Sequence, residues 1–260
     1  MKKSLFLAGA MALALGVAAS ASAQYAYGTD TNENLYVIDL SSGATTLVGN
    51  HGEFLESIAY DSTSGRLFGH DTNGTLFELS TVNGSVINSW STGLGNVEGM
   101  DFSEPGNLWL TDFSTQMNMH RWNVGLEALD NQLDTQVETG SVRAMCFDQP
   151  SPPVGNALFY GDSPDFQTLY AFDGLNPATA LGNNSGGSVY GMDMFGNKLY
   201  GLGGNGEIYL INAGDGSISI VGDTGDHFWL GMTTSAVPEP ATMLALGGAF
   251  AAMAARRRRK

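Results

Sequence analysis

The sequence predicts an all-β fold, a five-bladed β-propeller with four antiparallel strands in each blade. Three observations predict it: short apolar runs between turn residues, a repeat of about 41 residues, which is a period typical of propeller blades, and a composition rich in glycine. The 260 residues include 35 glycines, and only 14% of the residues are charged. This balance suits many turns and short strands better than long amphipathic helices. With 43% apolar residues, the chain can also bury a full core.

The repeat is clearest in residues 66–106. Four short apolar runs are separated there by turn residues, at 67–69, 75–79, 85–90 and 97–102. Two of the separations contain Asn-Gly, as Asn73-Gly74 and Asn83-Gly84. Asn-Gly between alternating apolar runs is a strong hairpin signal, because both residues tolerate the positive φ of a tight turn. We expect these four runs to form one antiparallel meander.

Three of the four strand types recur along the chain with different clarity. The first lies at 25–28, 67–69, 108–111, 158–161 and 199–202. The second lies at 34–39, 75–79, 117–123, 168–173 and 207–212. The third is weaker and lies at 44–48, 85–90, 126–139, 178–181 and 217–221, with a degenerate third copy. Five copies of a four-stranded unit predict five blades.

The fourth strand type aligns column by column, at 56–60, 98–102, 143–147, 190–194 and 230–234. One column is small throughout: Ser57, Gly99, Ala144, Gly191 and Gly231. The next column is large and apolar: Ile58, Met100, Met145, Met192 and Met232. Small residues suit an innermost strand, where several sheets crowd around one axis, and the apolar column would pack between neighbouring sheets.

The two ends of the repeat region predict how the ring closes. The region begins with a first-type strand at Tyr25 and ends with a fourth-type strand at Leu230. We expect the last strand to complete the blade begun by the first ones, which leaves no sheet with a missing member. The alternative architecture is a β-solenoid or an irregular sandwich. The third copy is longer, with His120-Arg121-Trp122, a polar run at 127–138 and prolines at 150–153. The extra residues of this copy form loops that either have a function or have none.

The charges are distributed unevenly. Residues 24–237 hold 25 acidic residues and only four basic ones, a formal charge of −21. The four basic residues are Arg66, Arg121, Arg143 and Lys198. Such a surface repels nucleic acids and anionic lipid headgroups, so a nucleic-acid role is excluded.

The N-terminus has the features of a signal peptide. Lys2 and Lys3 precede an apolar stretch at 5–19, and Ala21-Ser22-Ala23 offers small residues at the −3 and −1 positions of a cleavage site. We expect residues 1–23 to be removed by signal peptidase after transport by the secretion machinery. An uncleaved anchor is the alternative, although the apolar run is short for a membrane span.

The C-terminus carries the most specific motif. Pro238-Glu239-Pro240 is followed by an apolar run at 243–255 and then by Arg256, Arg257, Arg258, Arg259 and Lys260. Pro240 can begin a helix where its missing N–H costs nothing. The apolar run predicts a short transmembrane helix, and the five cations stay cytoplasmic because their transfer through the bilayer is too costly.

Residues 237–260 resemble the PEP-CTERM sorting signal of Gram-negative bacteria that make exopolysaccharide. The resemblance implies transient residence in the inner membrane. It also implies recognition and cleavage at Pro238-Glu239-Pro240 by an exosortase, a membrane-embedded cysteine transpeptidase. The released domain, residues 24–236, would reach the cell surface or a biofilm matrix. A plain C-terminal tail anchor is the alternative.

The fourth-type strands also supply the candidate site. Glu56, Glu98, Arg143 and Tyr190 hold equivalent positions, which Leu230 completes. If this column faces the mouth of the central channel, two carboxylates, a cation and an aromatic ring converge there and suit a sugar or a cation. We expect a non-catalytic binding or structural role in an exopolysaccharide matrix. Because five-bladed propellers include lectins and glycan-cleaving enzymes, a hydrolase or lyase that uses Glu56 and Glu98 stays open, as does adhesion to another protein.

The remaining chemistry-bearing residues favour structural roles. Cys146 is the only cysteine, and we expect a buried, inert thiol. The four histidines show no metal-ligand spacing, and no cofactor is expected. Five aspartates at strand ends suit side-chain turns first and calcium second: Asp61, Asp71, Asp112, Asp162 and Asp223. The four tryptophans could stack on sugars, but packing between blades is the expected role for those within strands.

Overall fold

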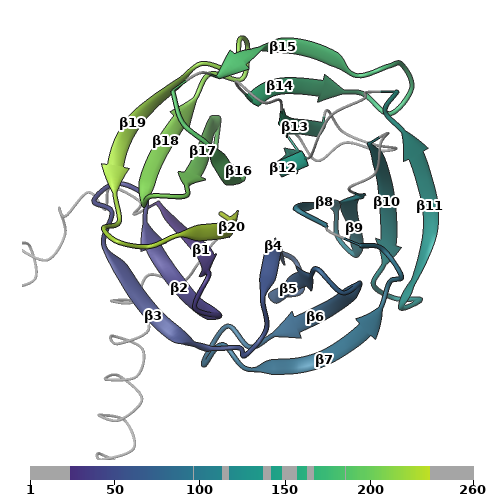
Figure 1. The fold of residues 1–260 in the computed structure, drawn as a ribbon. Helices are drawn as coiled ribbons and strands as arrows, with labels where there is room; N and C mark the ends of the chain where they lie inside the picture. Colours follow the sequence, from purple (N-terminus) through teal and green to yellow (C-terminus); the bar gives the residue numbers. More distant parts are fainter. Residues whose placement is uncertain are drawn as a thin grey trace, which may run out of the picture.

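The computed structural model describes residues 24–95, 97–112, 117–136, 142–147, 157–162, 167–184 and 186–234. These residues form twenty strands in five four-stranded antiparallel sheets arranged around one axis, so the predicted five-bladed propeller is confirmed (Figure 1). No helix in this part of the chain has the length and apolar character needed to cross a membrane. The signal segment and the tail with its expected transmembrane helix lie outside the described residues.

Each sheet runs from an inner strand at the axis to an outer strand at the rim (Figure 1). The first contains β20 (Trp229–Thr233), β1 (Tyr25–Asp30), β2 (Asn34–Asp39) and β3 (Thr45–Asn50). The second contains β4 (Leu55–Asp61), β5 (Arg66–Asp71), β6 (Thr75–Leu79) and β7 (Val86–Ser91). The third contains β8 (Gly99–Glu104), β9 (Asn107–Asp112), β10 (Asn118–Asn123) and β11 (Ala128–Asp134).

The last two sheets have the same order. The fourth contains β12 (Val142–Phe147), β13 (Ala157–Asp162), β14 (Gln167–Phe172) and β15 (Thr179–Asn184). The fifth contains β16 (Val189–Phe195), β17 (Lys198–Gly203), β18 (Glu207–Ile211) and β19 (Ile218–Asp223). The degenerate stretch of the third repeat is thus a regular outer strand, β11.

The ring closes as expected. The last strand, β20, pairs with the first, β1, and places Met232 opposite Gly28. This pairing covers the inner edge of β1, which would otherwise be exposed.

One expectation about the repeat is wrong. The four runs in residues 66–106 do not form one meander, because only β5, β6 and β7 share a sheet and β8 begins the next one. The chain crosses from the rim at β7 back to the axis at β8, so the sequence repeat and the blade are offset by one strand. The same offset leaves β20 to complete the first sheet.

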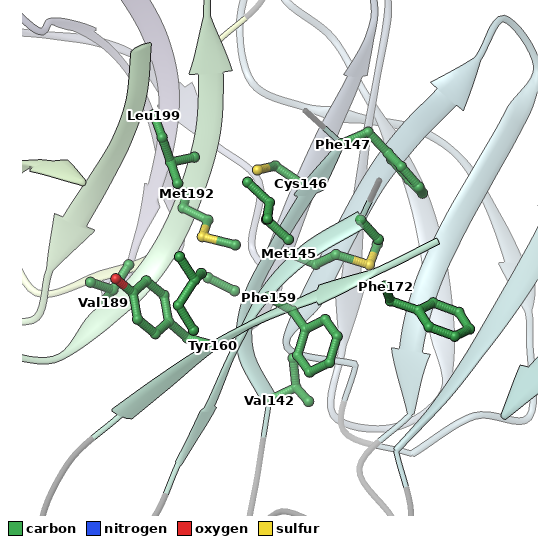
Figure 2. Close-up of a cluster of buried hydrophobic side chains, with 14 of the residues drawn as sticks. Val142, Met145, Cys146, Phe147, Phe159, Tyr160, Phe172, Val189, Met192 and Leu199 are labelled. Atoms are coloured by element: carbon green, nitrogen blue, oxygen red, sulfur yellow. The ribbon is translucent and has the colours of Figure 1, made fainter. Parts of the chain in front are cut away.

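The hydrophobic core lies between neighbouring sheets. Figure 2 shows one such cluster, in which Met145 and Phe159 of the fourth sheet lie with Met192 of the fifth. The apolar column of the inner strands is buried throughout, at Ile58, Met100, Met145, Met192 and Met232. Trp109, Trp122 and Trp229 are buried as well, so they pack within the core rather than offer stacking surfaces.

The small column lets the inner strands approach closely. A Cβ atom added to Gly99 would lie 2.9 Å from the Cβ of Met145 on the next inner strand. One added to Gly231 would lie 3.0 Å from the backbone nitrogen of Ile58. One added to Gly191 would overlap the backbone nitrogen of Met232. These contacts explain why small residues recur at this position.

Candidate functional site

Four inner strands carry a β-bulge at the end where they begin. Leu55 lies opposite Asp71 and Ser57 opposite His70, so Glu56 is an extra residue with no partner across the strand pair. Arg143, Tyr190 and Leu230 are extra residues of the same kind. A bulge re-aims the side chain of the extra residue. Three of the four site residues singled out in the sequence, all except Glu98, are therefore residues that the sheets release from regular pairing.

The side chains of two of these residues, Arg143 and Tyr190, form a connected cluster with Glu98. Arg143 Nη1 lies 3.3 Å from Glu98 Oε2, and these side chains are 33% and 11% exposed. The Arg143 guanidinium also lies over the Tyr190 ring, 5.4 Å from its centre. The Tyr190 ring lies 5.2 Å from that of Phe228, which precedes β20. Phe228 is 40% exposed, so the cluster has an accessible aromatic edge that the sequence did not reveal. We call this end of the ring the site mouth.

Glu56 has an unusual environment within the site mouth. Its pKa is raised to about 7, chiefly by burial and next by the negative charge of Glu98, with a smaller contribution from Asp71, while the positive charge of Arg143 opposes the shift. Its Oε2 atom is buried and accepts no hydrogen bond from the described residues. A buried acceptor of this kind costs about 1–3 kcal/mol when it stays unsatisfied. A proton or a donor from a ligand would relieve that cost.

The channel below the site mouth is almost closed. A cavity of about 10 Å³ lies there, and its lining includes Glu98, Tyr190, Met100, Met145 and Met192. That volume has room for about one water molecule. A ligand at the site mouth would therefore approach from outside the ring rather than thread through it.

The opposite end of the ring has a larger pocket. Its volume is about 350 Å³, and it is lined by the ends of the inner strands, including Asp101, Asp193 and Thr234. Because β20 ends at this pocket, the C-terminal tail begins here. We call this end the tail mouth.

The two aspartates at the tail mouth connect neighbouring inner strands. Asp101 Oδ2 accepts a hydrogen bond of 2.8 Å from the Phe147 backbone on β12. Asp193 Oδ2 accepts bonds from the Thr234 backbone (2.6 Å) and the Thr233 hydroxyl (3.0 Å). Burial raises the pKa of both carboxyls, and the charge of Asp193 raises that of Asp101 further. Their hydrogen bonds give them a structural role between sheets.

The histidines and the cysteine have structural surroundings, in line with the expectation from sequence. His70 is fully buried and its Nε2 lies 2.8 Å from the Thr92 hydroxyl. The His227 ring stacks on Trp229 at 4.8 Å. Burial lowers the pKa of His51 to about 4, and burial also lowers that of His120. Cys146 is buried in β12.

Aspartates at strand ends form the expected side-chain turns. Asp71 Oδ1 accepts hydrogen bonds from the backbone of Asn73 (2.9 Å) and Thr75 (2.8 Å). Asp61 and Asp223 accept comparable bonds, at 2.9 and 2.7 Å. Asp112 instead lies 3.6 Å from His120, and the side chain of Asp162 is outside the described part. Across the described residues, no group of three or more His, Cys, Asp or Glu side chains could hold a metal ion. Calcium binding remains the second option for these aspartates, after side-chain turns.

Comparison with known proteins bears on the tail and on the fold. The model for the PEP-CTERM protein-sorting motif matches residues 236–259. No curated protein sequence matches the chain. A chain of the nidogen/laminin complex is similar in structure, with a TM-score of 0.57 and 17% identity over 82% of this chain and 81% of that one.

Two further structures are similar, with lower TM-scores. A protein of unknown function from Bacteroides caccae has a TM-score of 0.49 and 12% identity, over 76% of this chain and 72% of its own. The WD40 β-propeller domain of Doa1 has a TM-score of 0.44 and 16% identity, over 79% and 67%. At such identities, structural similarity bears on the fold alone.

Proposed function

We propose that this exported PEP-CTERM protein, a substrate of exosortase, binds an extracellular polysaccharide at the site mouth. Its role is that of a non-catalytic binding or structural component of an exopolysaccharide matrix at the surface of a Gram-negative bacterium. The sorting motif at 236–259 supports export and processing. The site mouth supports the choice of ligand.

The connected cluster of Glu98, Arg143 and Tyr190 carries the proposal. Sugar rings present apolar faces to aromatic side chains and hydroxyl groups to charged or polar ones, and ligand sites combine these two kinds of surface. Tyr190 and Phe228 supply the aromatic surface, and Arg143 and Glu98 supply planar donors and acceptors beside it. Arg143 is fixed by contacts on both sides, which reduces the entropy lost on binding.

A pull-down with isolated cell-surface polysaccharide tests this function. The mature domain, residues 24–236, contains the whole closed ring. Tyr190→Ala should lower the affinity about tenfold, which corresponds to about 1.4 kcal/mol, because the sugar ring loses an aromatic surface to pack on. Tyr60→Ala removes a tyrosine at the tail mouth and serves as the matched control. Equal binding by both variants and the wild type would contradict the proposal.

One observation favours a second candidate function, glycan cleavage. The Glu56 carboxyl, with a pKa of about 7, suits a general acid. Glu98 supplies a second carboxylate, whose charge raises the pKa of Glu56. Release of new reducing ends from the isolated polysaccharide would show cleavage. Glu56→Gln and Glu98→Ala should each abolish that release, whereas binding without any release supports the non-catalytic role.

A further inference from the structure

We propose that the sugar bound at the site mouth carries a protonated amine, which the carboxylates of Glu56 and Glu98 bind. This inference rests on the proposed function and narrows its ligand to amine-bearing glycans. Three features of the described residues carry it: the charge of the site mouth, the unsatisfied acceptor of Glu56, and the pairing of cations elsewhere on the ring.

The site mouth has more negative than positive charge. Glu56, Glu98 and the nearby Asp71 face a single cation, Arg143. That cation is already paired with Glu98 at 3.3 Å and lies over Tyr190. An anionic sugar would meet uncompensated repulsion here, whereas a cationic group would restore the balance.

Glu56 supplies an acceptor that needs a donor. Its buried Oε2 accepts no hydrogen bond from the described residues. An ammonium group has three donors and a full positive charge, so it can satisfy both carboxylates at once. Arg143 instead pairs with Glu98 and lies over the Tyr190 ring.

The aromatic pair beside the carboxylates fits the same ligand. Tyr190 and Phe228 lie next to Arg143, and Phe228 is 40% exposed. An aromatic face attracts a cation as well as the apolar face of a sugar ring. A sugar with an amine substituent could use both properties, with its ring on the aromatic pair and its amine at the carboxylates.

The rest of the ring disfavours acidic polysaccharides. Residues 24–237 have a formal charge of −21 and four basic residues. Arg66 pairs with Glu78 at 2.8 Å, and Arg121 pairs with Asp130 at 2.6 Å. With Arg143, three of the four cations are therefore neutralised, and a polymer of uronic acids would find little positive charge to bind.

Calorimetry with three trisaccharides tests the inference. They are an unacetylated glucosamine trisaccharide, its fully N-acetylated form and a uronic acid trisaccharide, each titrated into the mature domain at about pH 6.5, near the pKa of Glu56, and at physiological salt. We expect the amine form to bind about tenfold tighter than the acetylated form, the gain from a charge-assisted hydrogen bond. Glu56→Gln should remove this preference. Glu104→Gln, the same change at the tail mouth, should keep it.

A second readout ties the effect to Glu56. A cation bound beside its carboxyl favours the ionised form, so binding should release a proton from Glu56 to the buffer. The apparent enthalpy should then differ between two buffers with different ionisation enthalpies, and Glu56→Gln should abolish that difference. If the difference in apparent enthalpy persists in Glu56→Gln, it comes from a nonspecific effect of a polycation, and the inference is overturned.

The remaining outcomes separate the two proposals. Equal or tighter binding of the acetylated or uronic acid form overturns the amine inference and leaves polysaccharide binding intact. Failure of the amine trisaccharide to bind, with the isolated polysaccharide still bound, overturns the inference alone. Failure of the isolated polysaccharide to bind overturns the proposed function itself.

Discussion

At the scale of single residues, Glu56 combines burial, an unpaired oxygen and a negatively charged neighbourhood. Burial contributes most to raising its pKa to about 7, and Glu98 contributes next. Folding therefore disfavours the ionised form of this carboxyl at alkaline pH. Carboxyls with a strongly raised pKa are common at functional sites, whereas a carboxyl with a purely structural role is usually paired with a donor or a positive charge.

Glu56→Gln should change how stability depends on pH. Because the folded pKa is raised from 4.5 to about 7, the contribution of Glu56 is fully present below pH 4.5 and is lost as the pH rises through 7. The variant should gain free energy of unfolding relative to wild type across this window, on the order of 2 kcal/mol after allowance for solvent screening. Urea titrations from pH 4 to 9 measure this.

Glu78→Gln is the matched control with the opposite sign. Hydrogen bonds from Arg66 lower the pKa of Glu78, so its contribution is present above the unfolded pKa and is lost as the pH falls. This variant should lose stability at neutral pH and approach wild type in acid. A parallel trend in the two variants would contradict the pKa assignments.

The alignment of Glu56, Glu98, Arg143 and Tyr190 could be seen in the sequence, because each precedes a small residue in a repeated strand. The release of Glu56, Arg143 and Tyr190 from regular pairing could not be seen. A β-bulge depends on the register between the inner strand and its neighbour, and no residue type at these positions indicates it in the sequence. The exposed ring of Phe228 was missed for a related reason, since it lies in the loop before β20 rather than in the aligned column.

At the scale of elements, the inner strands carry both the ring and the site. Four of them begin with a bulge. The middles of the inner strands hold the small and apolar columns, and Asp101 and Asp193 lie towards the ends of β8 and β16. The side-chain hydrogen bonds of these aspartates join β8 to β12 and β16 to β20. The Thr233 hydroxyl, which accepts a bond of 3.2 Å from the Tyr60 backbone, joins β20 to β4.

Gly191→Ala tests the close approach of β16 and β20. The added Cβ would overlap the backbone of Met232, which cannot move aside as a flexible side chain would. We expect a loss of about 1–3 kcal/mol in the free energy of unfolding, the usual cost of overpacking. Gly95→Ala is the control, because no atom lies within 4 Å of its added Cβ. Equal stability of the two variants would mean that the inner strands are less crowded than described.

The composition of each sheet was harder to predict than the strands themselves. Turn residues such as Asn73-Gly74 and Asn83-Gly84 separate the runs clearly. They do not reveal that the chain leaves the sheet between β7 and β8, since that crossing has turn residues as well. Only the unmatched strands at the two ends of the chain indicated the offset, through the predicted pairing of β20 with β1.

At the scale of the whole molecule, the ring has two different faces. Every inner strand begins at the site mouth and ends at the tail mouth, where Thr234 leads into the sorting tail. The point at which the described chain ends therefore lies at the opposite end of the ring from the site mouth. The acidic surface also keeps the domain from adhering to anionic lipids.

Changing Pro238, Glu239 and Pro240 together to alanine tests export and processing. Mass spectrometry of the native protein should show a mature chain that lacks everything after the triplet. The variant should keep its Arg-rich end and stay with the inner membrane, because the five cations resist transfer. Asp226→Ala, an exposed change outside the motif, should be processed normally. An Arg-rich end on the mature wild-type protein would contradict exosortase cleavage.

The most direct test of this account is a crystal structure of the mature domain with an oligosaccharide fragment of the cell's own polysaccharide. We expect a sugar ring against Tyr190 and Phe228, within hydrogen-bond reach of Glu98 or Arg143. A sugar bound instead in the tail mouth, beside Asp101 and Asp193, would contradict it.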